Sequence, residues 1–154
     1  MEQSTAQRQT VTAYLTVKDA PKAIEFYQNA FGAEELFRLS DPGGKIGHAE
    51  LAIGNSVVML SDEYPDFGAL SPQTIGGSPI KMHVSVQDAD AAVDRALKAG
   101  ATLARPLVDE FYGERTGMIT DPFGFSWFIS SPKEVVSPEE MQRRWSAQLA
   151  AKSA

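Results

Sequence analysis

The chain of 154 residues contains no cysteine, only two histidines and no long apolar run. Without cysteine it has no disulfides, no thiolate metal ligands and no cysteine nucleophile. No stretch approaches the roughly 20 apolar residues that a membrane span needs, so we expect no membrane partner. Basic residues number 14 against 20 acidic ones, a formal net charge of −6. This balance argues against nucleic acid, which binds basic surfaces.

The N-terminus also lacks the apolar core of a signal peptide. Residues 1–10 are mostly polar, so we expect a flexible N-terminal tail on a cytoplasmic protein. The absence of cysteine fits that location. The remaining composition, 43% hydrophobic and 22% charged residues, is typical of a globular protein with a sizeable core.

What the chain does contain is an internal repeat. The segment Val17–Ala20 recurs 69 residues later as Val86–Ala89, and each copy is followed by an amphipathic stretch that ends at a glycine, Gly32 or Gly100. Aspartate before such a stretch and glycine after it are typical helix start and stop signals. Because one strand–helix unit cannot bury its own apolar face, the two copies should pair and leave a cleft between them.

The pattern predicts an α+β fold of two tandem βαβββ units that form a cupped mixed sheet. The first unit, residues 11–61, should contain a strand, a helix and three strands over Val11–Val17, Ala20–Ala30, Glu34–Leu39, Gly47–Ile53 and Ser56–Ser61. The second unit, residues 80–131, should repeat that order over Ile80–Val86, Ala89–Ala99, Thr102–Val108, Arg115–Thr120 and Phe125–Ser130. Residues 62–79 hold three prolines and three glycines, which predicts a linker loop.

Residues 132–154 are predicted to form a separate C-terminal helix. It opens on Ser-Pro-Glu-Glu at 137–140, a capping-box serine with proline at the first helical position. Met141, Trp145 and Leu149 then make one apolar stripe. Such stripes commonly pack on their own domain. Because two complete units precede this helix, we also weigh packing on a second copy, and we expect a homodimer.

Strand alternation separates a core face from a ligand face. Successive side chains of a strand point to opposite faces, and one face of each predicted strand is polar. The apolar faces must meet the helices, so the polar faces should line a cup that suits a small organic ligand. The side chains that we assign to ligand binding are Tyr14, His48, Glu50, Lys81, His83, Tyr112, Arg115 and Phe128.

Some of these side chains are candidates for chemistry. Glu50 and His83 would make an acid–base pair in a semi-enclosed site, or a structural charge-assisted hydrogen bond. Arg115, with Glu114 beside it, would clamp a carboxylate or phosphate through its guanidinium fork, or form a solvated surface pair. The aromatic members would stack on a planar ligand or fill the core.

The motifs along the chain also carry a family resemblance. Paired units, the strand–Asp–helix–Gly-Ala signature and the turn Asp121–Gly124 together resemble the vicinal oxygen chelate superfamily of glyoxalase I, extradiol dioxygenases, and fosfomycin and bleomycin resistance proteins. The resemblance covers residues 11–131. Shorter motifs resemble its PhnB-like branch: Gly47–Leu51, Met59–Glu63, Gly113–Arg115 and Ser137–Met141.

That resemblance implies a metal site, with one His, Glu or Gln from each of four strands. Carried over to this chain, the ligand positions fall on Thr12, Lys81, Phe128 and Val58, or on Met59 if the register slips by one. A lysine ammonium has no free lone pair, and valine and phenylalanine have no donor atom. Divalent metals need such donors, so we expect no metal cofactor there.

Three hypotheses of function remain. The leading one is a metal-independent protein of the glyoxalase/bleomycin-resistance type that binds a small, partly aromatic molecule in the cup. The alternative is a lyase, isomerase or dioxygenase that uses His48, Glu50 and His83, with or without a divalent metal. Two histidines and a carboxylate suit Fe(II) or Zn(II) if they converge; otherwise the histidines orient a ligand or one another. The third hypothesis is an assembly module that depends on the C-terminal helix.

Overall fold

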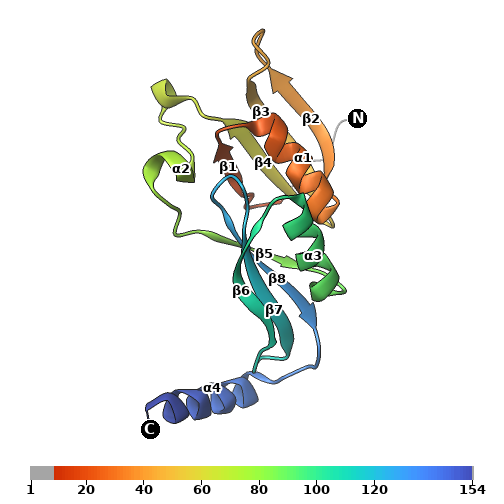
Figure 1. Cartoon of the computed structure of the whole chain (residues 1–154), viewed down its shortest axis with the longest axis vertical. Helices are drawn as coiled ribbons and strands as arrows, with labels where there is room; N and C mark the ends of the chain where they lie inside the picture. Colours follow the sequence, from red (N-terminus) through yellow and green to blue (C-terminus); the bar gives the residue numbers. More distant parts are fainter. Residues whose placement is uncertain (1–8, 154) are drawn as a thin grey trace.

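The computed structural model describes residues 9–153, and it contains two βαβββ units followed by a helix (Figure 1). The first unit consists of β1 (Tyr14–Val17), α1 (Ala20–Phe31), β2 (Glu34–Ser40), β3 (Ile46–Ile53) and β4 (Ser56–Asp62). The second unit consists of β5 (Lys81–Ser85), α3 (Ala89–Ala99), β6 (Thr102–Asp109), β7 (Glu114–Thr120) and β8 (Ser126–Pro132). The predicted α+β fold is confirmed. Most of the predicted N-terminal tail, residues 1–8, lies outside the described residues.

Two short helices lie in the segment that was expected to be a loop. They are the 3-10 helix η2 (Pro65–Phe67) and α2 (Pro72–Ile75), and α4 (Pro138–Ser153) follows the second unit. Each short helix begins at one of the prolines of the segment, where the missing N–H costs nothing. No helix within residues 9–153 is both long enough and apolar enough to cross a membrane.

The repeated aspartate and glycine do start and stop α1 and α3. Asp19 Oδ1 accepts a hydrogen bond from the backbone N–H of Lys22 at 3.2 Å, and Asp88 Oδ1 accepts one from Ala91 at 3.1 Å. Gly32 ends α1 in the left-handed region, at φ +68°. Local sequence therefore fixes where each helix lies between its flanking strands.

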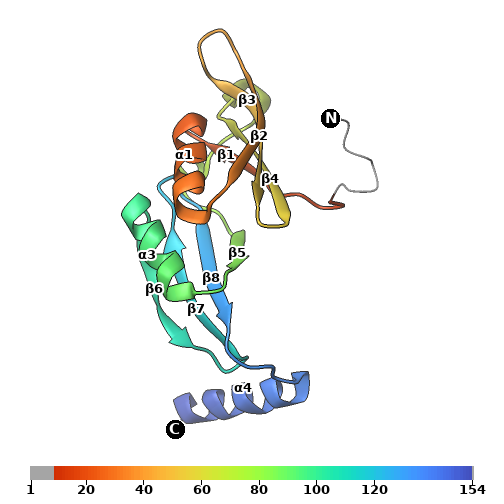
Figure 2. The same ribbon diagram turned by 90° about the vertical axis from the view of Figure 1, so that its right-hand side faces the viewer.

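Each unit forms its own four-stranded mixed sheet. The strand orders are β1-β4-β3-β2 and β5-β8-β7-β6, with the first pair of each order parallel and the others antiparallel. Helices α1 and α3 stack along one side of the molecule and leave the opposite face of each sheet without a helix (Figure 2). The faces that were expected to bind a ligand are therefore the uncovered ones.

A buried carboxylate joins the two units behind the sheets. Tyr27 on α1 donates its hydroxyl hydrogen to Asp121 Oδ2 at 2.6 Å, and the Trp127 indole N–H donates to the same oxygen at 2.9 Å. The backbone N–H groups of Phe123 and Phe125 donate to Asp121 Oδ1 at 2.9 and 3.0 Å. Burial raises the pKa of both Asp121 and Tyr27. The Asp-Pro-Phe-Gly turn thus packs against the first unit.

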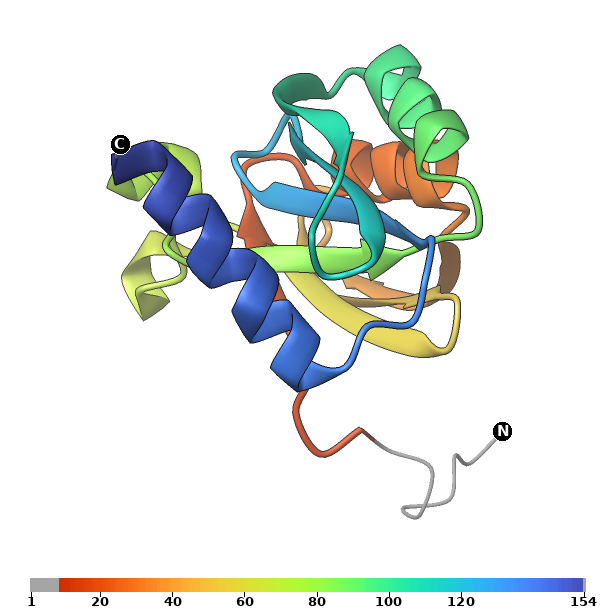
Figure 3. The ribbon, with the colours of Figure 1, turned by 90° about the horizontal axis from the view of Figure 1, so that it is seen from below.

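Helix α4 projects from the far end of the second unit (Figure 3). None of its residues is buried, and Trp145 and Leu149 are 48% and 49% exposed. The predicted serine cap is confirmed, because the backbone N–H of Glu140 donates to Ser137 Oγ at 3.2 Å. Arg144 ties the helix to the body through the carbonyl of Phe111, at 2.9 Å. The apolar stripe is consequently only partly covered by its own domain.

Candidate functional site

The uncovered face of the first sheet carries a hydrogen-bonded row of three side chains. Tyr14 Oη lies 2.9 Å from His48 Nδ1, and His48 Nε2 lies 2.8 Å from Glu50 Oε2. Because the carboxylate accepts from Nε2–H, Nδ1 is left to accept the tyrosine hydrogen. The Phe37 ring lies beside the imidazole, with the ring centroids 5.7 Å apart. We call Tyr14, His48 and Glu50 the first row.

The uncovered face of the second sheet carries a longer row. Tyr112 Oη donates to Thr116 Oγ1 at 3.3 Å, the Thr116 and Ser130 hydroxyls lie 2.8 Å apart, and Ser130 donates to Glu114 Oε2 at 2.5 Å. His83 Nε2 lies 3.8 Å from the same glutamate oxygen. The Thr116 and Ser130 side chains are buried. We call these five residues the second row.

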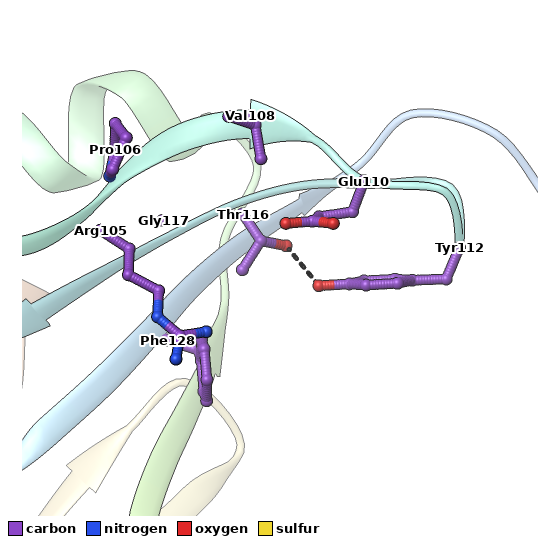
Figure 4. A pocket seen from close by; sticks show the side chains of 8 residues that line it. All are labelled: Arg105, Pro106, Val108, Glu110, Tyr112, Thr116, Gly117 and Phe128. Carbon is purple, nitrogen blue, oxygen red and sulfur yellow. Dashed lines mark hydrogen bonds between the residues drawn. The ribbon is translucent and has the colours of Figure 1, made fainter. Parts of the chain in front are cut away.

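A pocket of about 440 Å³ lies at the Tyr112–Thr116 end of the second row (Figure 4). Its volume falls within the range of small-molecule sites. The lining residues are Arg105, Pro106, Val108, Glu110, Tyr112, Thr116, Gly117 and Phe128. A second hollow, of about 400 Å³, lies between the β3–β4 turn and β5, and its lining includes His83 and Trp127.

The structure divides the predicted ligand-binding residues between the two sheets. The first sheet carries Tyr14, His48 and Glu50, and the second unit carries Lys81, His83, Tyr112 and Phe128. Tyr112 and Phe128 line the larger pocket, and His83 lies next to it, with its ring centroid 6.4 Å from that of Phe128. Lys81 is exposed, two residues before His83 on β5, and it lines neither hollow.

The expected pairing of Glu50 with His83 does not form within the chain. Each histidine instead meets a carboxylate of its own sheet, Glu50 for His48 and Glu114 for His83. Within residues 9–153, no group of three His, Asp or Glu residues is placed so that it could hold a metal ion. The two histidines and Glu50 therefore do not converge in one chain, because the histidines belong to different sheets.

Arg115 is also placed differently from the expectation. Its neighbours on β7, Glu114 and Thr116, face the pocket side. Because successive side chains of a strand point to opposite faces, Arg115 faces α3. There Nε donates to Asp90 Oδ2 at 2.8 Å and Nη1 donates to Asp109 Oδ1 at 3.2 Å. These bonds raise the pKa of Arg115 and lower that of Asp90. The guanidinium stabilises the packing of α3 and does not reach the ligand face.

The residues at the family's metal positions do not fit a divalent metal. Met59 is the partner of Tyr14 in the sheet, whereas Val58 is buried on the helix side. The ligand position of this strand therefore falls on Met59 and not on Val58. Phe128 is the partner of His83 and lines the pocket with a hydrocarbon ring. Together with the Lys81 ammonium, these groups offer a thioether, a ring and a cation where hard metals require oxygen or nitrogen donors.

Sequence reasoning missed part of the pocket wall, chiefly Arg105. The pairing of β6 with β7 slips between Arg105 and Val108, which are partners of Met118 and Thr116. This irregularity places residues three apart on the same face, where regular alternation would separate them. Pro106 was the available signal, since proline within a strand marks an edge or a bulge.

The chain is similar to known proteins over most of its length. A family model described as the Glyoxalase/Bleomycin resistance protein/Dioxygenase superfamily matches residues 8–129. The uncharacterized protein Mb0911c of Mycobacterium bovis is 41% identical over 141 residues, which are 90% of this chain and 93% of that protein. The crystal structure of the Arabidopsis thaliana gene product At5g48480 is 28% identical, with a TM-score of 0.65, over 80% of this chain and 98% of that one. A PhnB protein from Bacillus cereus shares the fold, at 20% identity and a TM-score of 0.59, over 80% and 99% of the two chains.

Proposed function

Because the chain belongs to the Glyoxalase/Bleomycin resistance protein/Dioxygenase superfamily, we propose that it binds a small, partly aromatic organic molecule without the metal of the superfamily's metal-using members. The observation that carries the proposal is the pocket of about 440 Å³ on the second sheet. Its lining combines the half-buried ring of Phe128 with hydroxyl and charged groups. A few polar groups around an apolar surface are typical of small-molecule sites.

Metal content is the first test of the proposal. The donor set at the family's positions supports a metal-free protein, so we expect mass spectrometry of chain purified without chelators or an affinity tag to find no stoichiometric transition metal. A stoichiometric metal would contradict the proposal. It would direct attention to His48, Glu50 and His83, which would then have to converge between two copies.

Ligand binding is the second test. We expect calorimetric titration with a panel of aromatic compounds to give saturable binding with no turnover. His83→Ala should weaken that binding, because the imidazole lies beside Phe128 and reaches the Glu114 carboxylate. Lys98→Gln, an exposed change on α3, serves as the control. Unchanged affinity in His83→Ala would show that the ligand lies elsewhere.

A homodimer is part of the proposal. Large apolar side chains are exposed on the uncovered side of the first sheet and on α4, among them Tyr14, Phe37, Leu39, Trp145 and Leu149. Exposed apolar groups of this extent commonly mark an interface between chains. A cytoplasmic location stays a prediction from the sequence.

The second candidate is an enzyme, a lyase, isomerase or dioxygenase. Two contacts support it: His48 Nε2 lies 2.8 Å from Glu50 and His83 Nε2 lies 3.8 Å from Glu114. A histidine hydrogen-bonded to a carboxylate, as His48 is, is suited to accept and return a proton, and His83 lies at ion-pair distance from one. Turnover of any bound compound, lost in both His48→Ala and His83→Ala, would favour the enzyme over the binding protein.

A further inference from the structure

Arg105 differs from the other described arginines in having no protein partner. In residues 9–153 the other arginines each donate hydrogen bonds to a carboxylate or carbonyl oxygen: Arg38, Arg95, Arg115, Arg143 and Arg144. The Arg105 side chain lines the pocket, with its guanidinium beside the ring of Phe128 (Figure 4). A guanidinium has only N–H donors, in a planar fork that matches a carboxylate or sulfonate. This end of the pocket is therefore a cationic donor.

The opposite end of the pocket is a hydrogen-bond acceptor, because the hydroxyl groups of the second row donate their hydrogens to one another and to Glu114. Ser130 has one hydroxyl hydrogen and donates it to Glu114. Thr116 must then donate across the 2.8 Å contact to Ser130, and Tyr112 donates in turn to Thr116. Every hydroxyl hydrogen of the row points toward Glu114, so Tyr112 Oη presents only lone pairs to a ligand.

Glu110 strengthens the acceptor end. Its half-buried side chain lines the pocket near Tyr112 and Thr116 (Figure 4), and among residues 9–153 it has no hydrogen-bond or ion-pair partner. A carboxylate accepts hydrogen bonds at two oxygens. Arg105 lies at the other end of the same pocket, on the same side as Phe128 (Figure 4).

The rest of the wall is largely apolar. The ring of Phe128 lies at the Arg105 end, and Pro106 and Val108 line the β6 side. An aromatic ring presents a flat surface on which a planar group stacks. The pocket thus has a cation and an aromatic surface at one end and a pair of acceptors at the other.

We infer that this pocket selects a planar, aromatic anion that also carries an N–H or O–H group. The anionic group binds Arg105, the ring stacks on Phe128, and the N–H or O–H group donates to Tyr112 Oη and Glu110. The inference rests on the proposed function and narrows it to a class of ligand. An uncharged aromatic compound, or an anion without a donor, satisfies only part of the pocket.

The test uses two fluorescent probes that differ in one group. Anilinonaphthalene sulfonate and phenylnaphthylamine share two aromatic ring systems and one N–H, and only the first carries an anion. Fluorescence titration gives the dissociation constant of each probe for the wild type, Arg105→Gln and Lys98→Gln. Lys98 is an exposed cation on α3 and controls for net charge. Phe128→Ala shows whether the probes occupy this pocket, because loss of the ring should lower the affinity for both probes.

We expect Arg105→Gln to lower the affinity for the sulfonate probe by about tenfold, because one charge-assisted contact is lost. Its affinity for the neutral probe should not change. Tyr112→Phe should lower the affinity for both probes by a similar factor, since both carry the N–H. If Arg105→Gln changes the affinity for both probes equally, or for neither, Arg105 does not bind the anionic group, and the proposed function still stands. If Tyr112→Phe changes the affinity for neither probe, Tyr112 does not accept the N–H of the ligand. If no probe saturates on the wild type, or Phe128→Ala affects neither, the pocket binds no aromatic ligand and the proposed function fails as well.

Discussion

At the residue scale, one carboxylate does the most to hold the two units together. Asp121 accepts hydrogen bonds from four donors on both units, and no cation lies among them. It is only 3% exposed. Buried acceptors of this kind are costly to leave unmatched. The side chain therefore matters for stability although it lies away from both rows.

We expect Asp121→Asn to lower the free energy of unfolding by about 2–4 kcal/mol, because the amide NH₂ would face one pair of donors. Tyr27→Phe, which removes a single donor, should cost about 1 kcal/mol. Urea denaturation measures both. Asp66→Asn, at an exposed position in η2, is the matched control and should change stability by less than about 0.5 kcal/mol. Equal stability of Asp121→Asn and wild type would refute this account of the contact.

At the element scale, Glu63 holds the segment between the two units. Its carboxylate accepts hydrogen bonds from the backbone N–H of Ser71, at 2.9 Å, and from the hydroxyl of Thr74. Ser71 and Thr74 lie at the start of α2. These bonds lower the pKa of Glu63 from its ordinary value of 4.5 to about 2. The segment is thus ordered through an ionised side chain.

The sign of the pH effect follows from that lowered pKa. A carboxyl whose pKa is lower in the folded chain contributes stability above its unfolded pKa, and the contribution disappears as the pH falls through the folded value. We expect hydrogen exchange across residues 63–79 to accelerate as the pH falls from about 4.5 to 2, relative to the intrinsic rate. Glu63→Gln should exchange faster at neutral pH and lose this dependence. Glu25→Gln, exposed on α1, should match the wild type; protection in Glu63→Gln equal to wild type would rule out the role.

Helix α4 is the second element with a testable role. Its apolar stripe is exposed in the single chain, and it lies beyond residues 8–129, which match the family model. We expect Trp145→Ala to weaken the proposed homodimer by at least about tenfold, because burying an indole contributes several kcal/mol. Size-exclusion chromatography over a dilution series measures this. Gln142→Ala, on the same helix, is the control. An unchanged dimer in Trp145→Ala would mean that the helix is not the interface.

At the scale of the whole molecule, the chain carries two rows on two sheets that share no hydrogen-bonded strand pair within residues 9–153. The first row contains His48 and the second contains His83. Each sheet also leaves two edge strands, β1 and β2 or β5 and β6. A second copy whose second sheet packs against the uncovered face of the first sheet would bring a first row opposite a second row. We therefore expect the cup to be completed across the homodimer.

Complementation between variants tests that arrangement. His48→Ala damages the first row and His83→Ala damages the second, so each homodimer has two damaged cups. In a mixed dimer one cup receives both changes and the other receives neither. Co-expression should therefore restore about half of the wild-type ligand stoichiometry in the mixed dimers, measured by calorimetry. Recovery of no binding would place the cup within one chain.

Local sequence was sufficient for the helices and strands of the two units and for most of the uncovered faces. The Asp and Gly signals placed α1 and α3 correctly, and alternation put Tyr14, His48 and Phe128 on the uncovered faces. Both kinds of signal depend on neighbours within a few residues, so the chain itself determines them.

Contacts between strands decided the rest. The irregular pairing of β6 turned Arg105 into the pocket, and β7 directed Arg115 toward α3. The choice of Glu114 over Glu50 as the partner of His83 depends on which strand lies beside β5. Register and strand order come from packing between residues far apart in the chain. The sequence by itself therefore determined the long helices, the strands and the faces of the regular strands, and only the tertiary structure determined which side chains meet on those faces.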